Sequence, residues 1–432
     1  MTGTIRMTHL DPAAPLPGPH LSGPHLSGPH LPGPHLPGQR DPRLDFFRGI
    51  SLIMIFMNHV PGTFFELLTS RNFGLSDAAE GFVFMSGCAV ALAYGPRMRD
   101  GLGLDMLRKS WGRAWQLYLV HLMTTVWAMA MVAGGVLWLG ADEVLKDNSF
   151  LMMWKQPIEV ILGVAILGHQ FGYVNILPMY AVLMLGAPFL VRLGLRNPIA
   201  LLGFSVCFWL LTWVLRLNLP NYPQAGGWFF NPFSWQLIFS LGILTGLALR
   251  DGRRLVPVMP WLVWIAAFWL LFCLAWVRNP EFKDMLNDGL ALLRDHGVPV
   301  LFAGFDKTYV SLPRLSHFIA LAYILSLPGL VPTIAASQAM DPIRLIGRHG
   351  LPVFALGTIL AIFAQVIKDI HPDGLEQDLL LVLGGLFAQW VLAFALEWNR
   401  QKDGRGVPPA PQKAAAQKAA PRRPALPGTS LR

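Results

Sequence analysis

The sequence predicts an all-α protein that crosses a membrane several times, and its composition and pattern carry that prediction. Of the 432 residues, 53% are hydrophobic and only 14% are charged. Apolar runs recur along the middle of the chain, and many approach the roughly 20 residues that a membrane-spanning helix needs. The runs are continuous, whereas the strands of a membrane β-barrel alternate apolar with polar residues. We therefore expect a polytopic helical membrane protein.

About ten segments are expected to span the membrane. In chain order they are 46–61, 78–94, 111–139, 173–193, 198–217, 233–249, 257–277, 315–331, 345–367 and 379–398. A further apolar run, Gln156 to Phe171, is short, and we interpret it as re-entrant or interfacial. This arrangement places both termini in the cytoplasm, together with the short basic loops at 97–113, 192–196, 250–254 and 344–348. If the short run also spans, the loop from Arg250 to Arg254 and the basic C-terminus move outside.

Two tails are predicted to flank a membrane domain that covers 40–399. Residues 1–39 contain a Gly-Pro-His-Leu repeat that cannot build a helix or bury a core, so we expect disorder. No fold fixes the geometry of its histidines, so no metal site is predicted. Residues 400–432 are expected to be a disordered basic tail. From Trp398 onward the chain has eight Lys or Arg and one Asp, which is +7 of the net +9 and favours an anionic lipid surface over nucleic acid.

Three ionisable residues, Asp45, Arg48 and His59, lie in the first predicted span. Arg48 and His59 are eleven positions apart, and at about 100° per residue this interval is three turns plus roughly 20°, so the two side chains share one stripe. Along the helix axis they are about 16 Å apart, which is about half of a hydrocarbon core of roughly 30 Å. Ionisable groups at that depth are costly and normally face a protein interior or a watery cavity, so these residues are functional candidates.

A carboxylate at Glu80, where the second predicted span begins, could meet His59. A histidine whose second nitrogen is held by a carboxylate has a fixed tautomer and a raised basicity, which suits a general base that acts on a hydroxyl group. The alternative is a structural ion pair between two helices, and the sequence leaves both interpretations open. Gly81, Ser86 and Gly87 follow and would allow this helix to pack closely.

Four further residues have both a functional and a structural interpretation. Arg113 and His121 are eight positions apart on the third predicted span and only partly share a face. The sequence alone favours a role for Arg113 in reaching the cytoplasmic membrane surface. Lys307 and Arg314, close to a later span, are well placed to hold an anion, although the segment around them also reads as an interfacial cap.

His317 and His349 each enter an apolar span, and for either one alone a packed histidine is the favoured interpretation. The sequence contains no GxSxG, HExxH or Walker A motif, and no GxGxxG that leads out of a strand. Hydrolase, zinc-protease and nucleotide-fold interpretations therefore have no support. Composition and spacing alone lead only to a multi-span protein with an intramembrane Arg and His stripe.

The interval between Arg48 and His59 is similar to the Arg-x10-His signature of the acyltransferase family 3 superfamily. An ordered set of blocks also resembles OpgC-type proteins, which succinylate osmoregulated periplasmic glucans, and the resemblance covers about 40–399. The blocks are DPRLDFFRG, NHVPG, SDAAEGFVFMSG, ILPMYAVLML, NPFSWQLIF, DKTYVSLPRLSHFIALAY and GRHGLPVFALG. The DxFRG portion at Asp45 to Gly49 also resembles the lysosomal transmembrane N-acetyltransferases, which supports acyl transfer and leaves the acyl group and the acceptor open.

The resemblance implies an O-acyltransferase of the bacterial inner membrane, with cytoplasmic succinyl-CoA or another acyl-CoA as donor, a periplasmic glucan as acceptor and no permanently bound cofactor. The implied catalytic residues are His59 as general base, with Glu80, Arg48 and Asp45. Donor binding is expected at Arg48, Arg97, Arg99 and Arg113. Substrate binding is expected at His121, Lys307, Arg314, His317 and His349. The expected partners are acyl-CoA, the glucan and the lipid bilayer, with no nucleic acid, and a homo-oligomer is compatible with them.

Direct transfer is preferred over an acyl-enzyme, because no Ser or Cys is recognisably paired with a base in the sequence; Ser86 is the remaining candidate nucleophile. A transporter or channel is the alternative class, and it predicts inverted repeats and broken helices in matching halves. The sequence shows no repeat outside the N-terminal tail. A scaffold is a third class, but it would leave Asp45, Arg48 and His59 unexplained.

Deletion of residues 1–39 is expected to leave acyl transfer intact, because a solvated repeat contributes nothing to the helical frame. The measurement is the acyl content of the product in cells that hold full-length and truncated protein at equal membrane levels. Loss of transfer in a well-expressed truncation would give the repeat a functional role.

Overall fold

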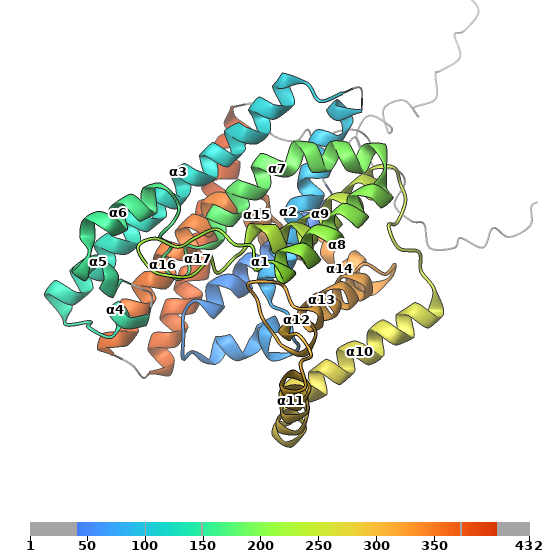
Figure 1. Cartoon of the computed structure of the whole chain (residues 1–432). Helices are drawn as coiled ribbons and strands as arrows, with labels where there is room; N and C mark the ends of the chain where they lie inside the picture. Colours follow the sequence, from blue (N-terminus) through green and yellow to red (C-terminus); the bar gives the residue numbers. More distant parts are fainter. Residues whose placement is uncertain (1–40, 100, 148–149, 372–373, 404–432) are drawn as a thin grey trace, which may run out of the picture. The chain divides into compact units, whose positions relative to one another are not determined.

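The structure is a computed structural model that describes residues 41–99, 101–147, 150–371 and 374–403. Its regular elements are helices, as the composition predicts, and the β pairing within those ranges is an isolated bridge between Pro220 and Gly227. Figure 1 shows how the helices are arranged. The predicted N-terminal tail, 1–39, and the predicted C-terminal tail beyond residue 403 lie outside the described residues.

Seventeen α-helices are present in the described ranges. The first nine are α1 (Pro42–Asn58), α2 (Ala78–Tyr94), α3 (Leu104–Gly134), α4 (Val144–Asp147), α5 (Leu151–Lys155), α6 (Pro157–Ala165), α7 (Ile176–Arg196), α8 (Pro198–Val214) and α9 (Pro232–Arg250). The others are α10 (Pro260–Arg278), α11 (Pro280–Asp295), α12 (Val300–Ala303), α13 (Leu312–Leu325), α14 (Leu330–Ala336), α15 (Asp341–Arg348), α16 (Gly350–Ile370) and α17 (Leu375–Lys402).

The two helices that carry the predicted site begin at strong local signals. Asp41 precedes α1, its carboxylate accepts a hydrogen bond from the first turn, and Pro42 occupies the first helical position. α2 begins with a capping box. The Asp77 side chain accepts a hydrogen bond from the Glu80 backbone N–H, and the Glu80 side chain accepts one from the Asp77 backbone N–H. These caps place Glu80 in the first turn of α2.

Seven helical segments in the described part of the chain are long and apolar enough to cross a membrane, and they contain α2, α3, α7, α9, α10, α16 and α17. α13 and α14 form an eighth candidate, with a bend of 75° between them. The multi-pass helical fold is therefore confirmed, whereas the expected count of about ten spans is not. α1 and α8 are not among these candidates; each has 17 residues, or about 25 Å of helix against a core of roughly 30 Å.

The short run from Gln156 to Phe171 contains α6, which has nine residues. Nine residues give about 13 Å of helix, which cannot cross a bilayer. The helix length therefore supports the re-entrant or interfacial interpretation of this run and not the alternative in which it spans.

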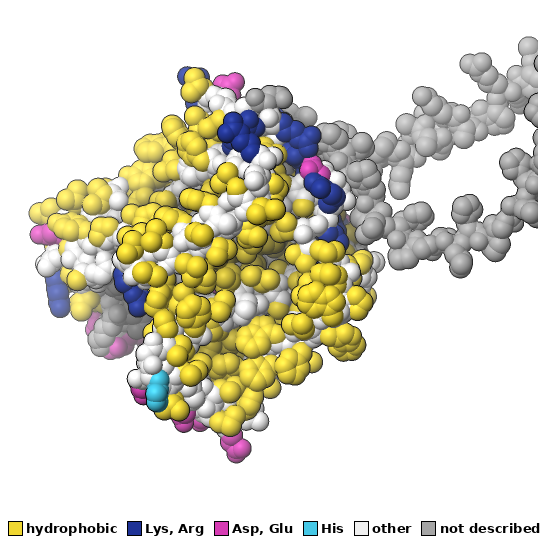
Figure 2. All heavy atoms as spheres, turned by 45° about the vertical axis from the view of Figure 1, so that its right-hand side comes forward, with side chains coloured by type: hydrophobic (Ala, Val, Ile, Leu, Met, Phe, Trp, Pro, Cys, Tyr) yellow, Lys and Arg dark blue, Asp and Glu magenta, His cyan; other side chains and the backbone are white. Residues whose placement is uncertain are grey.

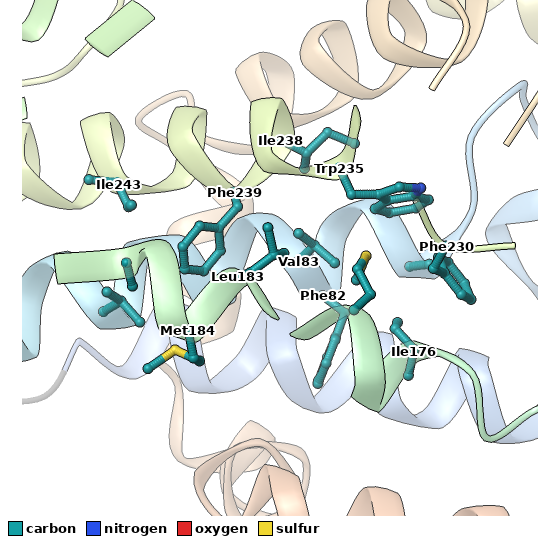
Figure 3. Close-up of a cluster of buried hydrophobic side chains, with 14 of the residues drawn as sticks. Phe82, Val83, Ile176, Leu183, Met184, Phe230, Trp235, Ile238, Phe239 and Ile243 are labelled. Carbon is teal, nitrogen blue, oxygen red and sulfur yellow. The ribbon is translucent and has the colours of Figure 1, made fainter. Parts of the chain in front are cut away.

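The main hydrophobic core lies where α2, α7 and α9 pack together (Figure 3). Val83 of α2 lies beside Leu183 of α7 and close to Phe239 of α9 in this view, and Phe82 and Ile243 belong to the same cluster. All five side chains are less than a tenth exposed. Since lipid tails are as apolar as these side chains, close packing rather than hydrophobicity must hold such helices together.

Glycines allow α2 and α9 to approach each other backbone to backbone. A Cβ atom at Gly87 would overlap the backbone oxygen of Phe239, and one at Gly242 would overlap that of Phe84. Small residues at a helix crossing are the usual means of close association in a membrane. The prediction of close packing at Gly87 therefore identifies a real crossing.

Glycines also allow α1 and α15 to approach each other backbone to backbone. A Cβ atom at Gly347 would overlap the backbone oxygen of Asp45, and one at Gly49 would overlap that of Ile343. The close approach brings Arg348, which follows Gly347, to the side of Asp45.

Three of the predicted cytoplasmic loops meet at one end of the described helices. Arg99 lies 2.9 Å from Asp251, and Arg192 donates hydrogen bonds of 2.9 and 2.8 Å to the backbone oxygens of Met98 and Arg99. Figure 2 shows hydrophobic side chains over most of one face, with Lys and Arg side chains gathered along its upper edge. An apolar face with a basic edge is the pattern that the positive-inside rule describes.

Gly242→Val is expected to lower the free energy of unfolding by about 1 to 3 kcal/mol or to prevent folding, because its side chain would be forced into the α2 backbone. Gly203→Val on α8 is the control, since a Cβ atom there meets nothing within 4 Å. Thermal unfolding of the detergent-purified proteins measures the difference. Equal stability of the two variants would contradict the close crossing.

Candidate active site

A small cavity lies along the α1 stripe at its His59 end. α1 ends at Asn58, and His59 is its C-cap residue. The α1 residues that line the cavity follow the spacing of one helical face, and Arg48 lies one turn earlier on that face. The complete lining is Leu52, Ile55, Phe56, His59, Phe354, Gly357, Thr358 and Gln389.

Charged side chains form a network at the opposite end of α1, which we call the inner cluster: Asp45, Arg48, Arg348, His349 and Glu397. Arg48 lies 3.4 Å from Asp45 and donates to the backbone oxygens of Gly347 and Met85 over 3.4 and 3.5 Å. Arg348 and His349 contact Glu397 at 3.0 and 2.8 Å. The bonds of Arg48 are at the long end of the hydrogen-bond range.

Glu397 is a member of the inner cluster that the sequence analysis missed. The Glu397 residue is 8% exposed, and its carboxylate accepts hydrogen bonds from Arg348 and His349. A lone acidic residue inside an apolar run was the available signal, because such a group needs a cationic partner. The structure thus gives His349 a carboxylate partner.

A second network, the outer cluster, consists of Asp77, Glu80, Lys307 and Arg314. Lys307 lies 2.5 Å from Asp77, while Arg314 lies 3.2 Å from Asp77 and donates through Nε to Glu80 over 3.0 Å. Burial opposes the ionisation of Asp77, but the positive charges of Lys307 and Arg314 hold its pKa well below the usual range. Two carboxyl groups and two cationic side chains therefore meet in the outer cluster.

The hydrogen bonds of Glu80 lead away from the predicted partner, His59. The buried carboxylate accepts from Arg314 and from the backbone of Asp77, and the described contacts of its side chain do not include the imidazole. The physical reason is that a guanidinium offers several donors and a full charge to a buried carboxylate. Of the two interpretations offered for Glu80, the structure therefore displays an ion pair between helices, with Arg314 as the partner.

His59 lines the cavity at the C-terminal end of α1. Its ring packs on the ring of Tyr173, with centroids 4.2 Å apart, and its backbone oxygen accepts a 2.8 Å hydrogen bond from Gln365. The charges of Lys307 and Asp77 are close enough to act on the imidazole. Tyr173 has a φ of 70°, a strained value for a bulky residue, and such strain often accompanies function. No sequence signal pointed to Tyr173.

His317 and Ser76 form a pair that the sequence did not reveal. Ser76 Oγ lies 2.8 Å from Nδ1 of His317, and the Ser76 backbone N–H also donates to that nitrogen. The other edge of the ring abuts Gly74, where a Cβ atom would overlap it. Both partners are less than 5% exposed. The pair thus closes the turn that leads into Asp77.

The remaining predicted site residues are spread over α3 and the basic end. His121 is fully buried, its Nδ1 donates to the Val174 backbone oxygen over 3.2 Å, and its Nε2 has no partner among the described residues. Arg113 contacts Gln116 at the surface. Arg97 lies in a 3₁₀ turn, Gly95–Met98, directly before Arg99 and its ion pair with Asp251.

The structure bears on a Ser86 nucleophile and on a metal site. The Ser86 hydroxyl donates to the Phe82 backbone oxygen over 2.8 Å, so it is paired with the backbone and not with a base. Within the described ranges, no group of three or more His, Cys, Asp or Glu side chains could hold a metal ion.

Comparison with protein families gives a match to the family described as OpgC protein over residues 40–401. Comparison with curated proteins and with solved structures gives no match. The family match includes α1 to α16, nearly all of α17 and every member of both charged clusters. Because it extends over far more than half of the 432 residues, the chain belongs to the OpgC family.

Proposed function

We propose that this OpgC-family membrane acyltransferase moves an acyl group, succinyl by resemblance, from cytoplasmic acyl-CoA to hydroxyl groups of a periplasmic glucan across the bacterial inner membrane. The observation that carries the proposal is the α1 stripe. Arg48 stands at one end beside the inner cluster, and His59 stands at the other end beside a cavity. The donor and the acceptor would meet at His59 from opposite sides.

The basic end supports donor binding. Arg97, Arg99 and Arg113 lie on α3 or on the turn that precedes it, where the phosphate groups of a CoA would find positive charge. Arg48 lies deeper, and its long bonds to Asp45 and to backbone oxygens can be exchanged for bonds to a ligand at little loss. Asp45 would keep the guanidinium in place before the donor arrives.

At His59 the transfer needs one base and one attacking hydroxyl. The imidazole would take the hydroxyl proton as the oxygen attacks the thioester carbonyl, the C–S bond would break, and the CoA thiolate would leave with a proton from the imidazolium. Tyr173 would hold the ring, while the outer cluster would form the wall toward the acceptor. The backbone pairing of Ser86 favours direct transfer over an acyl-enzyme.

We rank two alternative functions below acyl transfer to a periplasmic glucan. Another extracytoplasmic glycan or another acyl group would use the same site. A transporter predicts broken helices in matching halves, and the described residues contain one bent pair, α13 and α14, without a counterpart that meets the same test.

His59→Ala is expected to reduce transfer by about 10²- to 10⁴-fold, because the general base is lost while the surrounding helices keep their shape. His296→Ala is the control, since this histidine is exposed at the end of α11. Mass spectrometry of periplasmic glucans, with membrane levels of each variant matched, gives the readout. Full transfer by His59→Ala would remove His59 as the base.

The proposed sidedness can be tested with single cysteines at Phe64 and Arg253, whose side chains are well exposed. The background variant lacks Cys88, Cys207 and Cys273, the native cysteines. An impermeant maleimide added to spheroplasts should label position 64, and position 253 should be labelled only after the membrane is opened. The reverse pattern would place His59 on the cytoplasmic side and defeat a periplasmic acceptor.

A further inference from the structure

Two buried polar side chains in the cavity beside His59 have no role in the proposed chemistry. Thr358 of α16 is 2% exposed and Gln389 of α17 is 1% exposed. Apart from these two and His59, the cavity lining is apolar or glycine. Polar groups inside a membrane bundle are costly and usually serve a ligand or a pathway.

Both side chains keep hydrogen-bonding capacity toward the cavity. Thr358 Oγ1 donates to the Phe354 backbone oxygen over 3.0 Å, and Gln389 Nε2 donates to the Gly385 backbone oxygen over 3.2 Å. A hydroxyl that donates can still accept, and a glutamine amide has a second N–H and a carbonyl oxygen. Together they can therefore serve both the N–H and the C=O of a ligand amide.

Thr358 and Gln389 lie beside α1, at a level between Arg48 and His59 and closer to His59. Gly350, the first residue of α16, lies against Arg48, where a Cβ atom would be 3.1 Å from the arginine Cδ. Thr358 is eight residues further along α16, or about 12 Å, whereas His59 is about 16 Å beyond Arg48 along α1. Gln365, later on α16, bonds the His59 backbone, so the two helices run in the same direction.

Glycines bring the neighbouring helices close to this part of the stripe. A Cβ atom at Gly357 would meet the Gln389 amide, and one at Gly385 would overlap the Phe56 ring. The cavity is small in this structure. Leu52 and Phe56, which line it, must therefore change rotamer when a chain-like ligand enters.

We propose that Thr358 and Gln389 bind the amide group nearest the sulfur of the donor's pantetheine arm, an inference that rests on the proposed function. An amide that enters an apolar passage loses its water and needs replacement partners. These two residues supply them one step before His59, so that the thioester carbonyl reaches the imidazole. They are positioning residues, because they touch the arm and not the reacting atoms.

The test compares two donors with the same succinyl group. One is the N-acetylcysteamine thioester, which keeps the amide nearest the sulfur, and the other is the S-pentyl thioester, in which carbon atoms replace it. The wild type is expected to favour the first donor at least about tenfold in kcat/KM. Thr358→Val and Gln389→Leu should bring that ratio close to one, mainly through KM for the amide donor.

Matched variants separate binding from folding. Thr358→Ser keeps the hydroxyl and should keep the preference. Thr212 is on α8, outside the cavity lining, and its buried hydroxyl also donates to a backbone oxygen. Thr212→Val should therefore keep the preference for the amide donor.

Two results would overturn the assignment. One is an unchanged preference in folded Thr358→Val, and the other is a wild type that transfers from succinyl-CoA but shows no preference between the two short donors. Absence of transfer even from succinyl-CoA would instead defeat the proposed function, and the assignment with it.

Discussion

Charge pairing in a low-dielectric interior is the constraint on which the rest of this structure depends. The inner cluster joins α1 to Arg348 and Glu397, and the outer cluster joins the start of α2 to Lys307 and Arg314, so each cluster connects segments that are far apart in the sequence. Removal of one partner from such a pair leaves a buried charge uncompensated, at about 3 to 5 kcal/mol. The inner cluster therefore ties α1 to the later helices α15 and α17, and the outer cluster fixes the start of α2.

The features that could be predicted from the sequence are those that local geometry determines. The shared stripe of Arg48 and His59 follows from the pitch of an α-helix, and the caps at Asp41 and Asp77 follow from side-chain chemistry. The grouping of the basic loops follows from the preference of Lys and Arg for one side of the membrane. None of these requires knowledge of a distant contact.

The features that could not be predicted depend on tertiary contacts. Glu80 is paired with Arg314, which is 234 residues later in the chain, and no local pattern ranks that partner above His59. The Tyr173 ring packs at a tilt against the His59 ring, from a loop that follows an ambiguous apolar run. The expected count of about ten spans is not confirmed for a related reason, because hydropathy does not reveal where α13 gives way to a bend or where α1 stops.

The length of α1 has a consequence for the electrical work of transfer. Its 17 residues give about 25 Å of helix, less than the roughly 30 Å of the hydrocarbon core. If water reaches the charged clusters at both ends, most of the membrane potential falls across this shorter distance. An elementary charge that crosses the whole potential gains or loses about 2.3 kcal/mol per 100 mV. In a cell that is negative inside, an acyl group with a free carboxylate that moved outward along α1 would move toward the positive side of the membrane and lose electrostatic energy, so the potential itself would favour export of the group over its return.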